Sequence, residues 1–502
     1  MQIKEFVAPL FVCSLLLAAG CSTGGGAAAV STTSTSTTTT MTTTTTAATT
    51  IANLQPYADT TGTVATYTGA GVIDLNNHFF LPLGTNGRTC ASCHQLNQGM
   101  SISAAATQAL FTSTAGRDPL FAAVDGANCP TAADGDSAAR SLLLSKGLIR
   151  VGVTLPSTAE FKLTVTHDPY GCAITTSATG QQTVSIYRRP LPSTGLPYAS
   201  AVMWDTRETA QLLTMASTCA QNLTTDLTQQ MIDAVSGHAQ GNTTPTTAQI
   251  TETLTLMQGF YTAQATDTAA GSLSANGATG GPANFAALLY YPGINDAFGG
   301  DPTGAPFNPA AMTLFNSWRN STNAAQASIN RGQGVFNNSP MQITNVRGIN
   351  DNAALGSPAN LRGTCTTCHD APNVGSHSLP LVMDTGTTRI ATSETDPGIL
   401  AGTARLTASD LPVYQITGCK DATGKAVTYT TTDPGKGLFT GLCADINRVK
   451  VPSLRGLAAR APFFHNGSVD NMPQLVNFYN ARFQMNLSQA QQTDLVNFLN
   501  AL

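Results

Sequence analysis

The sequence predicts a mainly α-helical protein with two similar domains and long loops. Two observations support this fold class. The motif C-x-x-C-H occurs as "CASCH" at residues 90–94 and again as "CTTCH" at 365–369, which divides the chain into two halves. Apolar residues recur at helical spacing in several segments, and glycine and proline interrupt the chain between these segments.

Helices are expected in both halves of the chain. The expected segments are residues 206–217, 225–238, 246–265, 324–337 and a closing helix after Ser488. The segment 324–337 is rich in alanine, and Ser488 is a suitable N-cap residue for the closing helix. In that helix the apolar residues Leu495, Phe498, Leu499 and Leu502 recur at helical spacing.

The two C-x-x-C-H motifs have the spacing of covalent haem c attachment. In such sites two thiols bond the porphyrin and the adjacent histidine binds iron. A redox C-x-x-C pair needs no histidine, and a zinc site would need further cysteines or histidines close by. We therefore expect two covalently bound haem c groups, attached through Cys90, Cys93, Cys365 and Cys368, with His94 and His369 as iron ligands.

The N-terminus has the pattern of an export signal. Residues 1–20 contain an apolar run that is too short to span a bilayer, and Cys21 ends a sequence similar to a bacterial lipobox. We expect Cys21 to be lipidated and residues 21–55 to be a threonine-rich flexible tether; a plain signal peptide and a membrane anchor are the alternatives. The expected location is the cell envelope, on the periplasmic side or as an outer-membrane lipoprotein.

Charge and length limit the other possibilities. The net charge is −4 and charged residues make up 10% of the chain, so nothing indicates a nucleic-acid partner. A membrane contact is expected only through the lipid. The length suits two domains, or three small ones, and we place one haem c domain at residues 56–304 and a second at 305–502.

Five cysteines remain outside the leader, the lipobox and the haem motifs. In an exported protein some of them should pair. We favour Cys419 with Cys443, which bracket a segment with turn signals, and Cys129 with Cys172, which leaves Cys219 unpaired. The sequence alone does not fix this pairing.

The second half resembles the bacterial di-haem cytochrome c peroxidases and their MauG-type relatives. The resemblance lies in "CTTCH", "TTDPGKGLFTG" and "KVPSLRGLAARAPFFHNGSVDNMPQLVNFYN". In the first half, "CASCH", "RRPLP" and "VMWDTRE" are similar to segments of the same family. The resemblance covers about residues 70–502 and is patchier over 206–300, where about 16 residues look inserted.

The resemblance implies a division of labour between the two haem groups. The N-terminal haem on His94 would meet peroxide, and the C-terminal haem on His369 would relay electrons. A peroxidatic iron needs an open sixth position, whereas a relay iron works better with both axial positions filled. Tyr479 stands where the peroxidases have a methionine ligand and MauG-type proteins a tyrosine, so we expect it to bind the second iron. A packing tyrosine, with Met472 as the ligand, is the alternative.

Two aromatic residues match further family positions. Trp204 matches a residue between the haem groups, where an aromatic ring would shorten the electron-transfer gap; a buried packing role is the alternative. His465 matches the histidine of "FFHNG" and is expected beside the relay haem without binding it, against a role in stabilising the loop.

The acid/base residue departs from the family pattern. The family glutamate aligns with Gln240, which moves no protons, so we expect His238 to be the acid/base residue instead. A structural histidine at a helix end is the alternative. No histidine stands near Leu110, where classical peroxidases carry a displaceable ligand, so the first haem is expected to be open. His78 is an outside candidate for a ligand.

The calcium site of the family is also altered. Arg189 occupies the position of an asparagine that holds calcium between the domains, and its guanidinium could replace that charge, so calcium is doubtful here. His377 and His167 are assigned to structural or haem-edge contacts.

Three functions are compatible with the sequence. The first is reduction of hydrogen peroxide to water, with electrons from a small cytochrome c or cupredoxin. The second is a MauG-like oxidase that uses high-valent haem to oxidise a protein or organic substrate, which Tyr479 and the missing glutamate favour. The third is a non-catalytic electron carrier of the cell envelope. A homodimer is possible in each case.

Overall fold

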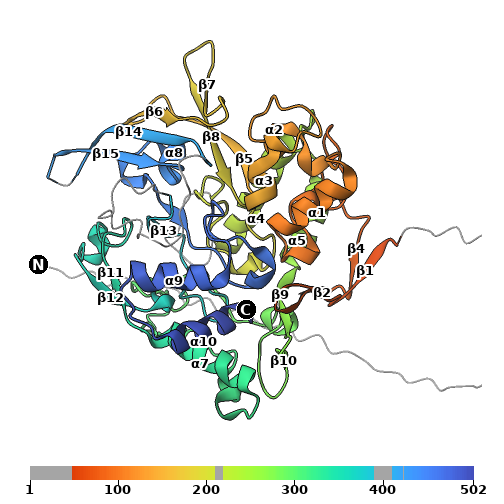
Figure 1. The fold of residues 1–502 in the computed structure, drawn as a ribbon, viewed down its shortest axis with the longest axis vertical. Coiled ribbons are helices and arrows are strands. Elements are labelled where there is room, and N and C mark those ends of the chain that lie inside the picture. Colours follow the sequence, from red (N-terminus) through yellow and green to blue (C-terminus); the bar gives the residue numbers. More distant parts are fainter. Residues whose placement is uncertain (1–47, 210–218, 389–409, 422) are drawn as a thin grey trace, which may run out of the picture. The chain divides into compact units, whose positions relative to one another are not determined.

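The computed structural model shows a mixed fold of helices and strands, so the mainly α-helical fold class predicted from the sequence is wrong. About 30% of the chain is helical and 18% forms strands. The structure describes residues 48–209, 219–388, 410–421 and 423–502 (Figure 1). The segments that were overlooked are rich in β-branched and aromatic residues, such as "QTVSIYR" at 182–188, which favour strands.

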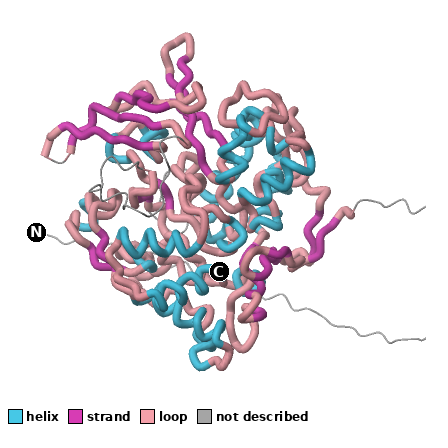
Figure 2. Tube along the Cα trace, in the orientation of Figure 1, coloured by secondary structure: helices cyan, strands magenta, loops and turns pink. Residues whose placement is uncertain are grey.

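Sixteen strands within the described residues form six small antiparallel sheets. Long loops connect them to the helices (Figure 2). In sheet order the strands are β1 (Thr50–Ala52) and β4 (Val72–Asp74); β10 (Gly271–Ser272), β9 (Tyr261–Asp267), β3 (Gly62–Tyr67) and β2 (Tyr57–Ala58); β11 (Met341–Ile343) and β12 (Leu361–Gly363); β13 (Val382–Met383) and β16 (Val449–Lys450); β15 (Ala426–Thr431), β14 (Val413–Lys420) and β6 (Lys162–His167); β5 (Ile149–Thr154), β8 (Gln182–Arg188) and β7 (Ile174–Thr176).

The α-helices within the described residues are between 4 and 19 residues long. They are α1 (Ala104–Thr114), α2 (Ala123–Gly126), α3 (Ser141–Lys146), α4 (Cys219–Gly237), α5 (Thr247–Gln258), α6 (Pro282–Phe285), α7 (Ala324–Asn338), α8 (Lys436–Thr440), α9 (Met472–Arg482) and α10 (Gln489–Asn500).

Three of the expected helices are confirmed. Helix α7 begins at Ala324, α4 covers residues 225–237, and Ser488 caps α10, where its hydroxyl accepts a hydrogen bond from the Gln491 main-chain N–H at 3.3 Å. The helix expected over 246–265 is wrong in its second part, because α5 ends at Gln258 and β9 begins at Tyr261. Of the helix expected over 206–217, residues 210–217 lie outside the described residues.

Residues Ala48–Leu502 form one compact unit. Strand β14 pairs with β6, with Val413 opposite His167, so one sheet joins segments from both halves of the chain. The largest apolar core surrounds α7, α9 and α10 and includes Trp318, Phe336 and Phe498. The division into domains at residues 304 and 305 stays a prediction.

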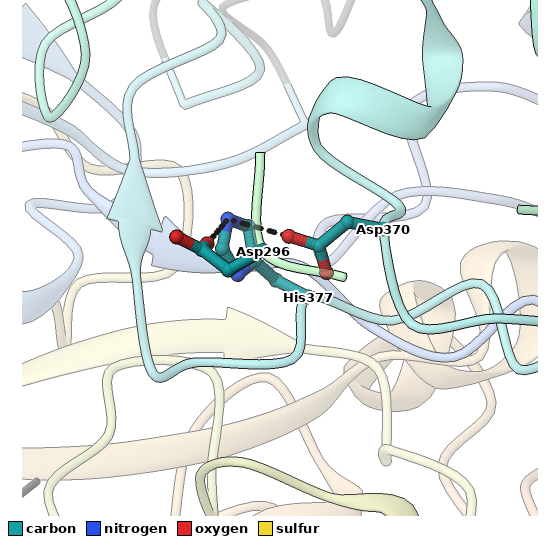
Figure 3. Close-up of side chains that lie close together, drawn as sticks. All are labelled: Asp296, Asp370 and His377. Carbon is teal, nitrogen blue, oxygen red and sulfur yellow. Dashed lines mark ion pairs between the residues drawn. The ribbon is translucent and has the colours of Figure 1, made fainter. Parts of the chain in front are cut away.

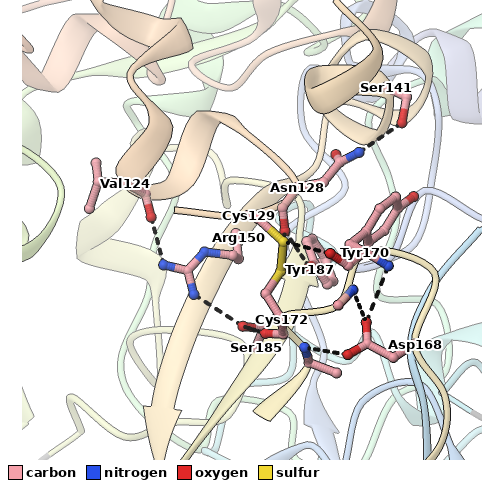
Figure 4. Close-up of a disulfide and its surroundings, with 12 residues drawn as sticks. Val124, Asn128, Cys129, Ser141, Arg150, Asp168, Tyr170, Cys172, Ser185 and Tyr187 are labelled. Atoms are coloured by element: carbon pink, nitrogen blue, oxygen red, sulfur yellow. Dashed lines mark hydrogen bonds between the residues drawn. A yellow bond between two sulfur atoms is a disulfide. The ribbon is translucent and has the colours of Figure 1, made fainter. Parts of the chain in front are cut away.

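Both expected disulfides are confirmed. Cys129 bonds to Cys172, and Cys419 bonds to Cys443. Figure 4 shows the first disulfide in a network in which the Tyr187 hydroxyl donates to the Asn128 carbonyl oxygen at 2.6 Å. The side chain of Cys219 lies outside the described part of the structure. Among the described residues, no helix is long and apolar enough to cross a membrane.

Helices α7 and α10 lie side by side (Figure 1). They approach each other closely at Gly332. A Cβ atom at this position would lie 1.9 Å from the carbonyl oxygen of Asp494. The Asp494 carboxylate also accepts hydrogen bonds from Ser328 and Arg331, which fixes the two helices in this register. Glycine at residue 332 is therefore a packing requirement.

We predict that Gly332→Ala destabilises the protein by about 1–3 kcal/mol, because the helices must move apart. Gly334→Ala, in the same helix, is the control. A Cβ atom there meets no atom within 4 Å, so helix propensity should make it neutral or stabilising by up to about 1 kcal/mol. Urea unfolding followed by circular dichroism measures both. Equal effects of the two substitutions would contradict the packing at Gly332.

Candidate active site

The first C-x-x-C-H motif lies in the wall of a cavity of about 220 Å³. A short 3-10 helix, Cys90–Ser92, presents the motif, and the Ser92 hydroxyl accepts a hydrogen bond from the Thr89 N–H at 3.1 Å. His94 Nδ1 donates to the carbonyl oxygen of Met100 at 3.2 Å. This bond leaves Nε2 without a proton, which is the form that binds a metal.

The second motif repeats this arrangement at a cavity of about 170 Å³. Its 3-10 helix is Cys365–Thr367, and the Thr367 hydroxyl accepts a hydrogen bond from the Thr364 N–H at 2.9 Å. His369 Nδ1 donates to the Gly375 carbonyl oxygen at 2.6 Å. Burial lowers the pKa of His369 to about 4, which keeps the imidazole neutral and able to bind a metal.

The residues around both cavities fit covalently attached haem groups. The four motif thiols are free, whereas Cys129, Cys172, Cys419 and Cys443 are all in disulfides. Lys450 lines both cavities and is half-buried, and the loss of solvent around its ammonium group lowers its pKa to about 8. The group donates to the Ala201 carbonyl oxygen at 2.5 Å and has no carboxylate partner among the described residues, so it could also pair with a haem carboxylate.

Trp204 lies in the wall that the two cavities share. Its side chain lines both cavities, and its indole Nε1–H donates to the Arg189 carbonyl oxygen at 2.8 Å. The ring makes an edge contact with His465, with 5.9 Å between the ring centroids. The structure thus places Trp204 and His465 together beside the second cavity.

His465 is buried and lies close to a network of charged residues. Its Nε2 is 3.6 Å from Asp433, and Arg188 bridges Asp433 and Asp205 with hydrogen bonds of 2.6–2.9 Å. Burial lowers the pKa of His465 to about 4, although the charge of Asp433 opposes this shift. His465 is therefore neutral at pH 7.

Arg189 forms part of the same shared wall. Its guanidinium donates to the main-chain carbonyl oxygens of Ile102 at 2.5 Å, Lys146 at 2.9 Å and Arg460 at 2.7 Å. These carbonyls come from segments on both sides of residue 304. The guanidinium therefore connects main-chain segments from both halves of the chain.

Tyr479 of α9 packs against the largest apolar core and lines the second cavity together with Val476 of the same helix. Its ring packs against Phe464, Phe478 and Phe483, and no described residue forms a hydrogen bond with its hydroxyl. Burial raises the pKa of Tyr479 well above its ordinary value, so the phenolate forms only beside a strong positive charge such as iron. Met472 is buried in the core and does not line this cavity.

His238 lies in the wall of the first cavity, directly after the end of α4. Its Nδ1 forms a short hydrogen bond with the carboxylate of Asp125, and the other oxygen of Asp125 pairs with Arg88. Burial alone would raise the pKa of Asp125, but its contacts with His238 and Arg88 lower it below the ordinary value. Asp125 is thus a buried anion that orients the imidazole.

Arg88 and Asp125 were missed by the sequence analysis. Asp125 lies 113 residues before His238, in a segment without a recognisable motif. Gln240 is exposed and does not line the cavity; its side chain contacts Asn86, which binds the His238 carbonyl oxygen at 2.8 Å. His78 also lies away from the cavity and pairs with Glu252 at 3.0 Å.

We predict that Arg189→Lys destabilises the protein by about 2–4 kcal/mol, because one ammonium group cannot reach three carbonyl oxygens that the guanidinium holds together. Arg362→Lys, on an exposed strand, is the control and should change stability by less than about 0.5 kcal/mol. Urea unfolding of the haem-loaded protein measures both. If the two substitutions have equal effects, the contacts of Arg189 do not hold the wall.

Comparison with known proteins supports the resemblance found in the sequence. No protein-family model matches the chain. A cytochrome-c peroxidase of Denitromonas iodatirespirans, IdrP2, is 31% identical over 148 residues, which make up 28% of this chain. The match spans 36% of the length of that relative.

A solved structure was also found, that of a MauG-like protein associated with microbial copper homeostasis. It is 13% identical, the alignment covers 66% of this chain and 77% of the other, and the TM-score of 0.30 is below the level that indicates a common fold. The curated relative confirms the resemblance of this chain to the bacterial cytochrome c peroxidases.

Proposed function

We propose that this protein is an exported di-haem c-type oxidoreductase that reduces hydrogen peroxide to water. The main observation that supports this proposal is the pair of cavities. Each cavity has a C-x-x-C-H motif in its wall, and Trp204 lines both. Haem c would supply the iron that binds peroxide in the first cavity and the iron that passes electrons in the second. The described residues account for the remaining requirements.

His238 is the proposed acid/base residue of the first cavity. Cleavage of the peroxide O–O bond requires a proton to move from one oxygen to the other, and an imidazole at the cavity wall can carry it. Asp125 holds the imidazole through Nδ1, so Nε2 is the nitrogen that remains for the substrate. Each turnover consumes two electrons and two protons and forms two water molecules.

Electrons are proposed to enter at the second cavity and to cross by way of Trp204. The donor would be a small cytochrome c or cupredoxin, because each delivers one electron at a time. The shared wall, which Arg189 fixes through three carbonyl oxygens, keeps the distance between the cavities constant. No calcium is required by this arrangement.

A MauG-like oxidase is the second candidate function. It is favoured by Tyr479, whose hydroxyl has no hydrogen-bond partner among the described residues and whose ring lines the second cavity. An anionic phenolate ligand stabilises oxidised iron more than a thioether does. The substrate would then be a protein or an organic molecule. A non-catalytic carrier is the outcome if neither activity is found.

Export and lipid anchoring are part of the proposal. Two disulfides are compatible with folding in an oxidising compartment, as in the periplasm. Cys21 would carry the lipid, and the threonine-rich segment would separate the anchor from the folded part. Residues 1–47 lie outside the described residues, and Thr50–Ala52, at the end of the tether expected over 21–55, already form β1.

We predict two haem c groups per chain, one for each motif. The double substitution Cys365→Ala and Cys368→Ala should halve the haem content and leave the first site loaded. A pyridine haemochrome assay on the purified full-length protein measures this ratio. One haem per wild-type chain would contradict the proposal.

We predict that His238→Gln lowers peroxide turnover by about 10²–10⁴-fold, as expected for the loss of a general acid/base. Peroxide binding should change little, because the iron ligands are untouched. His78→Gln is the matched control, since His78 lies outside the cavity and should leave turnover unchanged. Stopped-flow mixing with peroxide separates binding from turnover. Equal rates in the two variants would exclude His238 from the reaction.

Asp125→Asn should lower turnover, but less than His238→Gln does. The imidazole stays in the cavity wall, but it loses a charge-assisted hydrogen bond that orients it. Stopped-flow mixing of peroxide with the haem-loaded variants measures both rates. Unchanged turnover in Asp125→Asn would mean that Asp125 only supports the fold.

A further inference from the structure

A second group of metal-ligand side chains lies outside the walls of both cavities. Asp296, Asp370 and His377 come together in the loops beside the second C-x-x-C-H motif, and each is at most 2% exposed. Figure 3 shows the imidazole of His377 between the two carboxylates. The peroxide reaction proposed above uses none of the three residues.

The main chain holds one oxygen of each carboxylate closely. The second oxygen is free in Asp296, and in Asp370 it accepts only a long hydrogen bond, from the Ala297 N–H at 3.4 Å. Asp296 Oδ2 accepts hydrogen bonds from the N–H groups of Phe298 at 3.0 Å and Gly300 at 2.6 Å. Asp370 Oδ1 accepts one from the Ser378 N–H at 2.7 Å. The second oxygens, Asp296 Oδ1 and Asp370 Oδ2, face His377. The cluster is thus oriented before any ligand binds.

Buried polar atoms in this cluster lack partners. Neither Asp296 Oδ1 nor His377 Nε2 has a hydrogen bond within the described part of the chain. No lysine or arginine among the described residues pairs with either carboxylate. Two buried carboxylates without a counter-charge are costly, so either a bound cation or a shared proton must offset their charge.

The distances favour a metal ion over direct hydrogen bonds. His377 Nε2 is 3.5 Å from Asp370 Oδ2 and 3.9 Å from Asp296 Oδ1, both too long for good hydrogen bonds. Ligand atoms at about 2.1 Å from a tetrahedral metal are separated by about 3.4 Å. The three ligand atoms all lie within 4.8 Å of one another, so small side-chain shifts bring them into this geometry.

We propose that Asp296, Asp370 and His377 bind a divalent transition metal ion, of which zinc and manganese are the best candidates. Imidazole with two carboxylates suits these ions, whereas calcium and magnesium prefer oxygen ligands alone. His377 Nδ1 accepts a hydrogen bond from the Leu379 N–H at 3.2 Å, so Nε2 carries the proton of the neutral ring. Metal binding at Nε2 moves this proton to Nδ1 and breaks the bond to Leu379, and three metal–ligand bonds offset that loss.

The metal would stabilise the loop that orients the second haem motif. Asp370 directly follows His369, and His377 lies two residues after Gly375, whose carbonyl oxygen holds His369 Nδ1. Binding both ends of the segment 370–377 to one ion would fix this carbonyl. This proposed role of the metal ion is structural. A protein that binds no metal at this cluster could still reduce peroxide, so the two proposals can be tested separately.

The test measures zinc in the full-length, haem-loaded protein, because zinc is counted separately from haem iron. The protein is treated with a chelator, loaded with Zn²⁺, desalted and analysed by mass spectrometry. The wild type should retain about one zinc per chain. Asp296→Asn, which keeps the shape of the side chain, should lower zinc affinity by more than the roughly 10–100-fold that outer partners of a ligand cost.

Asp301→Asn is the matched control. Asp301 is a buried carboxylate in the same loop, but it accepts hydrogen bonds from Asn295 and Thr303 and lies outside the cluster, so this variant should retain zinc. Retention of as much zinc by Asp296→Asn as by the wild type would overturn the proposal. So would a wild type that retains neither zinc nor manganese, which would mean that a shared proton neutralises the cluster.

Zinc-edge X-ray absorption of the wild type tests the ligands without relying on a variant that folds. The proposal requires nitrogen and oxygen neighbours at about 2.0–2.2 Å, including one imidazole. Sulfur neighbours would place the zinc at the motif cysteines, and a spectrum without imidazole would place it on the surface. Either result would overturn the assignment.

Discussion

The wall between the two cavities depends on the buried guanidinium of Arg189. The guanidinium donates hydrogen bonds to three main-chain carbonyl oxygens, those of Ile102, Lys146 and Arg460. The main chain of Arg189 adds two more bonds. Its N–H donates to the His465 carbonyl oxygen at 2.7 Å, and its carbonyl oxygen accepts from the indole N–H of Trp204. A single residue therefore links the first motif's surroundings to the loop that carries His465. An arginine keeps its charge when it is buried, and its planar fork reaches several acceptors at once. The position of Trp204 follows from these bonds.

The two cavities are alike in how they hold a histidine and different in what faces it. In each, a carbonyl oxygen six residues after the histidine accepts a hydrogen bond from Nδ1. The first cavity adds His238 with the anion of Asp125, which suits proton transfer. The second adds Tyr479 in an aromatic setting, which suits a permanent ligand. The difference in these facing residues, and not in the motifs, supports different roles for the two sites.

Much of the site could be predicted because its residues are close in sequence. The C-x-x-C-H motifs, the capped helix α10 and the disulfide between Cys419 and Cys443 all depend on local spacing. The strands were not predicted because they are short and rich in threonine, and such segments show no helical periodicity. Asp125 and Arg88 meet His238 only through the tertiary fold, so no local pattern indicates them. The cluster around His377 could not be predicted for the same reason. Asp296 lies 74 residues before Asp370 in the sequence, and only the fold brings them together.

The most direct measurement is the electron paramagnetic resonance spectrum of the ferric protein as isolated, with its optical spectrum before and after addition of cyanide. Apart from His94, His238 is the only histidine among the described residues that lines the first cavity, and we propose that it moves protons and does not bind iron. One haem should therefore be high-spin and should bind cyanide without prior reduction. The other, for which we propose His369 and Tyr479 as ligands, should be low-spin and unchanged. Two low-spin haem groups that do not bind cyanide would contradict an open first site and leave electron transfer as the function.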